Sequence, residues 1–255
     1  MTSGFEKHRI THSSPSAINT WIENPAFWMM QKLYGKKYPY GFAAKRGIVI
    51  EDAVVNVIAK GYDEDKAIEM ALKEYDIFGA LSSDPRREKE RESIEPTVRL
   101  LNEELKQYGE PTFPEDSKQH KVELVCKGDN WELPIMGYLD LYYPQHGMII
   151  DIKTTSRMPS TMSDAHRRQA GLYAKASGNQ HVKFLYATPK KLQYLECGDV
   201  DGTIAEVKQH IIRQESFLSV SEDKNFLAKI VPLQTDSFYY DSLEAVRDRK
   251  EIFGI

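Results

Sequence analysis

The chain has 255 residues, of which 41% are hydrophobic, and this is enough apolar sequence to bury one sizeable core in a globular protein. Its net charge of -4 excludes a generally basic surface, so contact with nucleic acid would need a local basic groove helped by a bound metal ion. Cys126 and Cys197 form no CxxC spacing, which excludes a thiolate-bound zinc or iron–sulfur site. The sequence has no apolar run of roughly 18 residues and no secretion signal, so we expect a cytoplasmic protein without a membrane partner.

The first half of the sequence predicts helices. The first dozen residues lack a helical pattern and are expected to be frayed. Ser14-Pro15-Ser16 predicts a helix start, because serine caps a helix and proline fits its first turn, and Pro25 is expected to break or kink that helix. Further helices are predicted at about 43–59, 63–78 and 86–108, the last disturbed by Pro96.

After Pro114 the apolar period changes from that of a helix to that of a strand. Paired strands are predicted at 121–127 and 131–140, followed by a hairpin, a helix at 161–177, strands at 181–188 and 191–197, and a helix at 201–218. The fold class is therefore α/β or α+β, in one domain spanning residues 1–255. A helical region at 14–115 precedes a mixed central sheet flanked by helices at 116–220, and 221–255 form a weakly patterned C-terminal extension.

The hairpin predicted between Gly137 and Thr155 carries an unusual set of charges. Its two β-patterned runs are joined by Pro144-Gln145-His146-Gly147, and pairing of Tyr143 with Met148 would place Asp140 opposite Asp151, where two carboxylates repel. Alternation then places Lys153 on the same face as Asp151. Such a face packs poorly but suits Mg²⁺, which prefers oxygen ligands. A slip of one residue would separate the aspartates, and both could instead be surface residues of an edge hairpin.

Two helices carry further candidate residues. Glu51 interrupts the apolar helical run GIVIEDAVVNVI, and Gly47, one turn earlier on the same face, would permit close approach of another backbone, whereas Asp52 is expected to be exposed. Gln169 and Tyr173 are four residues apart and share one helix face. Together with the hairpin, these residues suit phosphodiester hydrolysis, in which carboxylates hold one or two magnesium ions and Lys153 polarises the water or neutralises the phosphate.

These segments, taken in order, resemble a known motif series. Gly47 to Glu51, the GYLD segment ending at Asp140, the DIKT segment beginning at Asp151, and Gln169 followed by Tyr173 are similar to the motifs of the RecB-like branch of the PD-(D/E)XK nuclease superfamily. The segment SPSAINTWIENPAFWMMQKL resembles the N-terminal signature of that branch. The resemblance covers roughly residues 14–173 and extends to the cores of CRISPR adaptation nucleases and phage recombination exonucleases.

The resemblance implies a restriction-endonuclease-like core, with the N-terminal helical region arching over a DNA channel. It implies that Glu51, Asp140, Asp151 and the main-chain carbonyl of Ile152 bind the metal ion, and that Lys153 is the catalytic lysine. Gln169 would orient the lysine, a metal-bound water or a phosphate. Tyr173 would support Gln169 or contact DNA.

Two departures from the family pattern affect the cofactor. Many relatives have a metal-binding histidine where this chain has Ile50, which weakens the case for a manganese preference, although Mn²⁺ could substitute for Mg²⁺. Members with an iron–sulfur cluster have cysteine where this chain has Asn24, and the C-terminal cysteine trio is missing, so no cluster is expected.

The DNA contacts predicted from the sequence are less specific. Arg168, beside Arg167, would give its helix basic character near a bound phosphate. Lys45 and Arg46 end a segment from Tyr34 that interleaves aromatic and cationic residues, a mixture that suits base stacking and phosphate contact. The same segment could instead pack on its own core. The histidines form no ligand cluster and are expected at the surface.

The function implied by the resemblance is a magnesium-dependent deoxyribonuclease, an exonuclease that trims DNA ends in recombination, repair or replication, of phage or bacterial type. One alternative is a single-strand or structure-specific endonuclease that uses the same site. Another is a non-catalytic DNA-binding or assembly protein, but loss of function would tolerate loss of Glu51, Asp140, Asp151 or Lys153, and all four are present. A single-strand annealing or recombination protein as partner and a homo-oligomer are both compatible with this interpretation.

Overall fold

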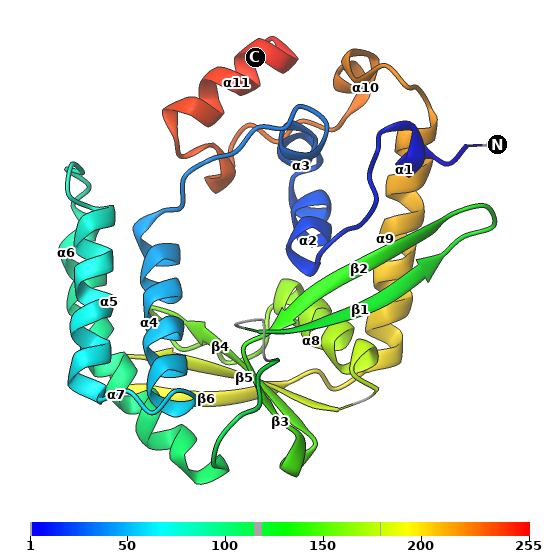
Figure 1. Cartoon of the computed structure of the whole chain (residues 1–255). Helices are drawn as coiled ribbons and strands as arrows, with labels where there is room; N and C mark the ends of the chain where they lie inside the picture. The colour runs from blue at the N-terminus through cyan, green and yellow to red at the C-terminus, as the bar shows by residue number, and fades with distance from the viewer. Residues whose placement is uncertain (1, 115–118, 179) are drawn as a thin grey trace.

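The computed structural model describes residues 2–114, 119–178 and 180–255 (Figure 1). The helices before the first strand are α1 (Gly4–Lys7), α2 (Pro15–Glu23), α3 (Pro25–Lys32), α4 (Phe42–Ile58), α5 (Glu64–Phe78), α6 (Arg86–Glu92), α7 (Ile94–Leu105) and the 3-10 turn η1 (Lys106–Tyr108). The strands are β1 (His120–Lys127), β2 (Glu132–Leu139), β3 (Leu141–Tyr143), β4 (Met148–Thr154), β5 (His181–Thr188) and β6 (Lys191–Glu196). The later helices are α8 (Asp164–Ala176), α9 (Val200–Ser219), α10 (Lys224–Ile230) and α11 (Leu243–Phe253), and the turns η2 (Pro144–His146) and η3 (Phe238–Tyr240) complete the elements.

The central sheet is mixed, as predicted. Its strand order is β3-β4-β5-β6, with β4 and β5 parallel and the other neighbours antiparallel, while β1 and β2 pair in a separate two-stranded sheet. The parallel pair requires a crossover, and α8 provides it. Figure 1 shows the long β1–β2 ribbon extending away from the central sheet toward α9.

Helices cover both faces of the central sheet. On one face, α4, α5 and α7 form a core with Ile150 and Ile152 of β4. On the other face, α8 packs Ala170 and Tyr173 against Ile149 of β4 and its sheet neighbours. The alternation of Ile150 and Ile152 with Asp151 along β4 therefore separates the apolar core under α4 from the face that carries Asp151 and Lys153.

A second core lies under the N-terminal helices. Residues of α1, α2 and α3 pack with β2, α9 and α10, and the buried side chains include Trp28, Leu133 and Ile211. The N-terminal helical region therefore divides into α1–α3, which pack mainly outside the central sheet, and α4–α7, which lie against it.

The hairpin has the predicted register. Tyr143 pairs with Met148 and Leu141 pairs with Ile150. The connection is a 3-10 turn ending in Gly147, whose φ of 56° is the left-handed conformation that glycine adopts without a steric penalty. The register and the turn together set the distance between the two aspartates.

The expectation of a frayed N-terminus is wrong. Ser3 caps α1, Phe5 is 2% exposed, and the amides of Gly4 and Phe5 donate to the Glu215 carboxylate at 2.6 and 3.0 Å. Glu215 lies in α9, more than 200 residues away in the chain, so no local pattern could predict the contact.

The helices also differ from the prediction in three respects. The long helix breaks at Ser93, because Pro96 is the third residue of α7, where its missing N–H has no partner to lose. α8 begins at Asp164 after its Ser163 cap, later than predicted. α10 and α11 form in the weakly patterned C-terminal extension, where Ala245 packs with Phe27 and Met30. Among the described residues, no helix is both long and apolar enough to cross a membrane.

Candidate active site

The hairpin brings Asp140 and Asp151 together beneath the surface. Asp140 joins β2 to β3, and its Oδ2 accepts a hydrogen bond from the main-chain N–H of Ile152 at 2.9 Å. That bond fixes Asp140 beside the residue that follows Asp151. The two side chains are 7% and 1% exposed, so neither is a surface residue of an edge hairpin.

Glu51 completes an acidic cluster from the other side. Burial, followed by the charges of Asp151 and Asp52, raises the pKa of Glu51 to about 7. Burial and the charges of Asp151 and Glu51 raise the pKa of Asp140 well above its ordinary value, and burial raises that of Asp151. Asp52 is half-buried rather than exposed as expected, so it adds to the repulsion. The three acids therefore destabilise one another unless a cation lies near them.

Lys153 supplies one positive charge. Its Nζ lies 2.5 Å from Asp151 Oδ1 and 4.9 Å from the centre of the Phe184 ring. Burial alone would lower the pKa of Lys153, but the charges of Asp151 and Asp140 outweigh burial and raise the pKa above the ordinary range. Lys153 is consequently an ammonium group at neutral pH and cannot act as a proton acceptor there.

Gln169 and Tyr173 reach the cluster from α8. Gln169 Nε2 donates to Asp151 Oδ2 at 3.2 Å and to the Tyr173 hydroxyl at 2.9 Å. Tyr173 packs against Gly137, where an added Cβ would lie 2.4 Å from Tyr173 Cε1. A Cβ on Gly47 would lie 3.2 Å from Thr154 Oγ1, so the neighbour that approaches Gly47 is a side chain and not the predicted backbone. The observed partners of the Gln169 amide are thus Asp151 and Tyr173.

Two site residues were missed by sequence analysis. Gln119 Nε2 donates to Glu51 Oε1 at 2.9 Å and to Asp140 Oδ1 at 3.3 Å. His166 is half-buried rather than at the surface, its Nδ1 lies 2.6 Å from the Tyr186 hydroxyl, and burial and the charge of Lys153 lower its pKa to about 4. His166 precedes Gln169 by three residues on the same helix face, a spacing that could have indicated it. Gln119 has no such signal, because it comes from another segment.

Glu51 and Lys153 open onto solvent at the edge of the cluster, where two hollows lie. One hollow, of about 510 Å³, is lined by Gly47, Glu51, Ile152, Lys153 and His166, among others. A second, of about 280 Å³, shares Lys153 and His166 with it and continues toward the start of α8. A substrate could therefore reach Lys153 and Glu51 from the same side.

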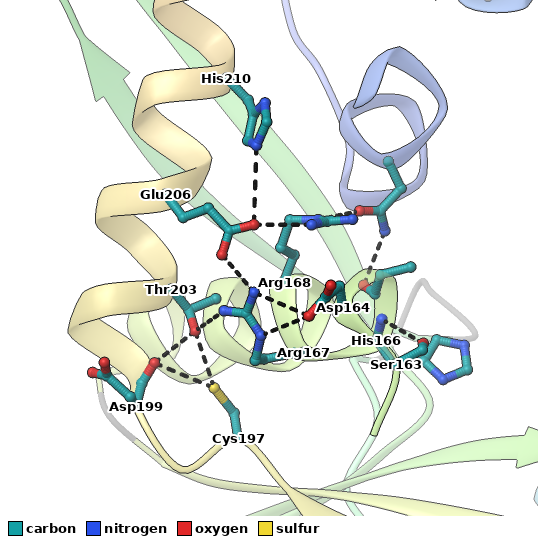
Figure 2. A network of polar contacts seen from close by, with 12 residues as sticks. Ser163, Asp164, His166, Arg167, Arg168, Cys197, Asp199, Thr203, Glu206 and His210 are labelled. Atoms are coloured by element: carbon teal, nitrogen blue, oxygen red, sulfur yellow. Dashed lines mark hydrogen bonds and ion pairs between the residues drawn. The ribbon is translucent and has the colours of Figure 1, made fainter. Parts of the chain in front are cut away.

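Arg168 does not face these hollows. It is 5% exposed, donates to Glu206 at 2.9 Å and to Asn19 at 2.7 Å, and so joins α8 to α9 and α2 (Figure 2). Figure 2 also shows Arg167 reaching Glu206 and Asp164. The structure thus gives Arg168 a packing role in place of the predicted DNA contact, because its guanidinium is buried and already paired.

The predicted cations before Glu51 are also paired. Arg46 is 6% exposed and pairs with Glu90, and Lys45 Nζ lies 2.5 Å from Glu74. In the tyrosine-rich segment before them, Tyr38 donates to Asp248 and its ring lies 5.1 Å from that of Phe27, whereas Tyr40 is exposed. These contacts favour the alternative in which this segment packs on its own core.

The acidic cluster fits a divalent cation in its chemistry. Within residues 2–114, 119–178 and 180–255, no three histidine, cysteine or acidic side chains converge closely enough to enclose an ion as they stand. However, Asp151 Oδ1 is among the buried atoms of this part of the chain that accept no hydrogen bond, and its neighbour at 2.5 Å is the Lys153 ammonium, with which it forms an ion pair. Buried carboxylates with raised pKa values and an unsatisfied oxygen are a donor set that hard divalent ions prefer.

The fold and this cluster define a class of protein: a mixed sheet, covered by helices, with a hairpin that presents two aspartates and a lysine. The model of the PD-(D/E)XK nuclease superfamily matches residues 12–248, and the chain belongs to that superfamily. Membership implies a nuclease that hydrolyses phosphodiester bonds of DNA, and nucleases of this superfamily usually use divalent metal ions. Assignment to the RecB-like branch stays a prediction.

Other comparisons add little. No curated protein matches the chain. A solved structure described as the crystal structure of SSO0001 covers 76% of this chain and 88% of its own, at 12% identity and a TM-score of 0.36. That likeness is too weak to support an inference.

Proposed function

We propose that the protein is a magnesium-dependent deoxyribonuclease that removes nucleotides from DNA ends in recombination, repair or replication. The observation that carries the proposal is the contact geometry of the acids: Glu51 and Asp140 accept hydrogen bonds from the same Gln119 amide, and Asp151 pairs with Lys153, which lines an open hollow together with Glu51. The cytoplasm is the compartment in which such an enzyme would meet DNA ends.

The proposed metal ligands are the carboxylates of Glu51, Asp140 and Asp151 and the carbonyl of Ile152. When bound, the cation would supply Lewis acidity that activates a water and neutralises the phosphate. The hydrogen bond from the Ile152 N–H holds Asp140 in place, and Gln169 holds Asp151. These fixed donors orient the carboxylate oxygens before the substrate arrives.

Lys153 would bind the scissile phosphate as a cation. Its raised pKa keeps the ammonium protonated, so it stabilises negative charge that develops on the phosphate and can hold a water through a hydrogen bond. His166, with its lowered pKa, is a neutral imidazole at pH 7 and can only exchange hydrogen bonds in the hollow.

Digestion from DNA ends is the finer part of the proposal. It is supported by the resemblance of the motif series to recombination exonucleases and not by the shape of the site. A single-strand or structure-specific endonuclease would use the same residues, and a non-catalytic DNA-binding protein would have no need of the charged Lys153 beside three clustered acids.

Digestion of end-labelled linear DNA and closed circular DNA, with Mg²⁺ or with EDTA, tests the proposal. We expect labelled mononucleotides from linear DNA in Mg²⁺, intact circles, and no product in EDTA. Lys153→Ala should reduce cleavage at least about 100-fold, the effect of losing one charge-stabilising donor. Lys190→Ala, at an exposed turn, is the matched control and should cleave like the wild type.

Each result decides between the alternatives. Cutting of circles would establish the endonuclease and contradict the exonuclease. Wild-type activity in Lys153→Ala, or equal digestion in EDTA, would contradict the assignment of the site.

A further inference from the structure

Gln119 places its side-chain amide between two of the proposed metal ligands. It lies just before β1, and its Nε2 is 2.9 Å from Glu51 Oε1 and 3.3 Å from Asp140 Oδ1. An amide nitrogen carries two hydrogens, so one side chain can donate to both carboxylates at once. A neutral donor thus stands between two acids that would otherwise face each other.

The position of this amide also matches that of a metal ligand. Neighbouring oxygen ligands of an octahedral magnesium ion, each about 2.1 Å from the ion, lie about 3.0 Å apart. The end of the Gln119 side chain is 2.9 and 3.3 Å from the two carboxylate oxygens. It therefore lies where a third ligand, next to both, would lie.

Only one end of the amide can bind a cation. The N–H₂ end points its hydrogens at the carboxylates and would repel a cation, whereas the oxygen is a hard, neutral ligand. The terminal torsion of glutamine is broad and roughly two-fold, so a half-turn exchanges the two ends without moving the backbone.

We infer that Gln119 is a further ligand of the divalent cation through its Oε1, and that the same amide, turned the other way, stands in for the cation when the site is free. The inference rests on the proposed metal-dependent function. A neutral ligand adds an oxygen without adding to the repulsion among Glu51, Asp140 and Asp151. On the α4 side, the residue before Glu51 is Ile50, which is 0% exposed and apolar, so it contributes no ligand.

Calorimetric titration of the whole protein with Mg²⁺ and Mn²⁺ tests this role. Gln119→Leu removes both ends of the amide at similar size and should weaken binding about tenfold or more, by analogy with the loss of groups that support metal ligands. Gln119→Glu keeps an oxygen in the same place and should bind at least as tightly as the wild type. Gln107→Leu, at an exposed glutamine, is the matched control and should not change the affinity.

Thermal unfolding in EDTA provides the second readout. Both Gln119→Leu and Gln119→Glu lose the donor that separates the carboxylates, so both should unfold at a lower temperature than the wild type. Gln119→Glu, which adds a fourth acid, should be the less stable of the two in EDTA and should recover most when Mg²⁺ is added.

The outcomes separate this inference from the proposed function. If the wild type binds no divalent cation, the metal-dependent function fails and the inference fails with it. If the wild type binds the cation and Gln119→Leu binds it equally well or more tightly, only the role of Gln119 as a ligand is overturned.

Discussion

The pKa of the Glu51 carboxyl depends on its burial and on the charges around it. Its pKa of about 7 results from burial and from the neighbouring charges of Asp151 and Asp52, so the folded protein holds a proton there that the unfolded chain releases near pH 4.5. The same burial that makes the carboxylate costly without a cation makes it an effective ligand with one. A residue that is destabilising on its own is thus consistent with a binding role.

The pKa of Glu51 predicts a pH dependence of stability for the protein in EDTA. Because the folded state binds the proton more tightly, this contribution is fully present below about pH 4.5 and is lost as the pH rises through about 7. The shift corresponds to at most about 3–4 kcal/mol. His166, with a pKa lowered to about 4, has the opposite slope below pH 6.5, so the difference between wild type and Glu51→Gln isolates Glu51.

Chemical unfolding of both proteins between pH 5 and pH 8 measures this difference. We expect Glu51→Gln to become progressively more stable than the wild type as the pH rises, and Mg²⁺ to stabilise the wild type selectively. A constant difference across that range would show that Glu51 does not titrate as the structure indicates.

Gly137 provides a second test at this scale. A Cβ at this position would lie 2.4 Å from the Tyr173 ring, so Gly137→Ala should displace Tyr173 and with it the Gln169 amide that holds Asp151. We expect a loss of about 1–3 kcal/mol in unfolding free energy, the usual cost of overpacking, together with weaker Mg²⁺ binding. Gly198→Ala, where nothing lies within 4 Å of the added Cβ, should change neither quantity.

At the scale of elements, the hairpin and α8 build the site and α9 holds α8 in place. The register of β3 against β4 sets the two aspartates, and the crossover α8 returns over the same sheet face with Gln169 and His166. Arg168, on the same helix, points instead to Glu206 of α9 (Figure 2). One helix therefore divides its polar residues between the site and the packing of its neighbours.

The packing role of Arg168 predicts the result of Arg168→Gln. Removing one partner of a buried pair costs about 3–5 kcal/mol, and partial exposure of Glu206 should reduce this to about 2 kcal/mol. The slope of DNA affinity against salt concentration should stay that of the wild type, because no phosphate contact is lost. A shallower slope with unchanged stability would restore the predicted DNA contact and contradict the packing role.

At the scale of the whole molecule, local sequence patterns predicted most of the helices and strands. They did not predict the contacts between segments that are far apart in the chain. The period-two runs around Asp140 and Asp151 predicted the hairpin and its register, because pairing within a hairpin is determined by the turn and a few neighbours. The burial of α1 by Glu215, and the formation of α10 and α11, depend on partners far away in the chain. Such contacts leave no periodic signal.

The candidate site also contains residues that local sequence patterns predicted and contacts that they did not. Glu51, Asp140, Asp151, Lys153, Gln169 and Tyr173 were predicted because spacing and motif order indicated them, and the structure places them in one contiguous set of contacts and charges. Gln119 reaches the cluster from before β1, and the pairing of Lys45, Arg46 and Arg168 with acids depends on other helices. Side-chain partners of this kind cannot be inferred from one segment alone.

The central claim is that the carboxylates of Glu51, Asp140 and Asp151 bind a divalent cation, and equilibrium titration of the protein with Mg²⁺ tests it most directly. We expect saturable binding by the wild type that Asp140→Asn weakens at least about 100-fold, since loss of a ligand should exceed the 10–100-fold effect of losing a supporting group. Equal binding by Asp140→Asn and the wild type, or no binding by either, would contradict the account.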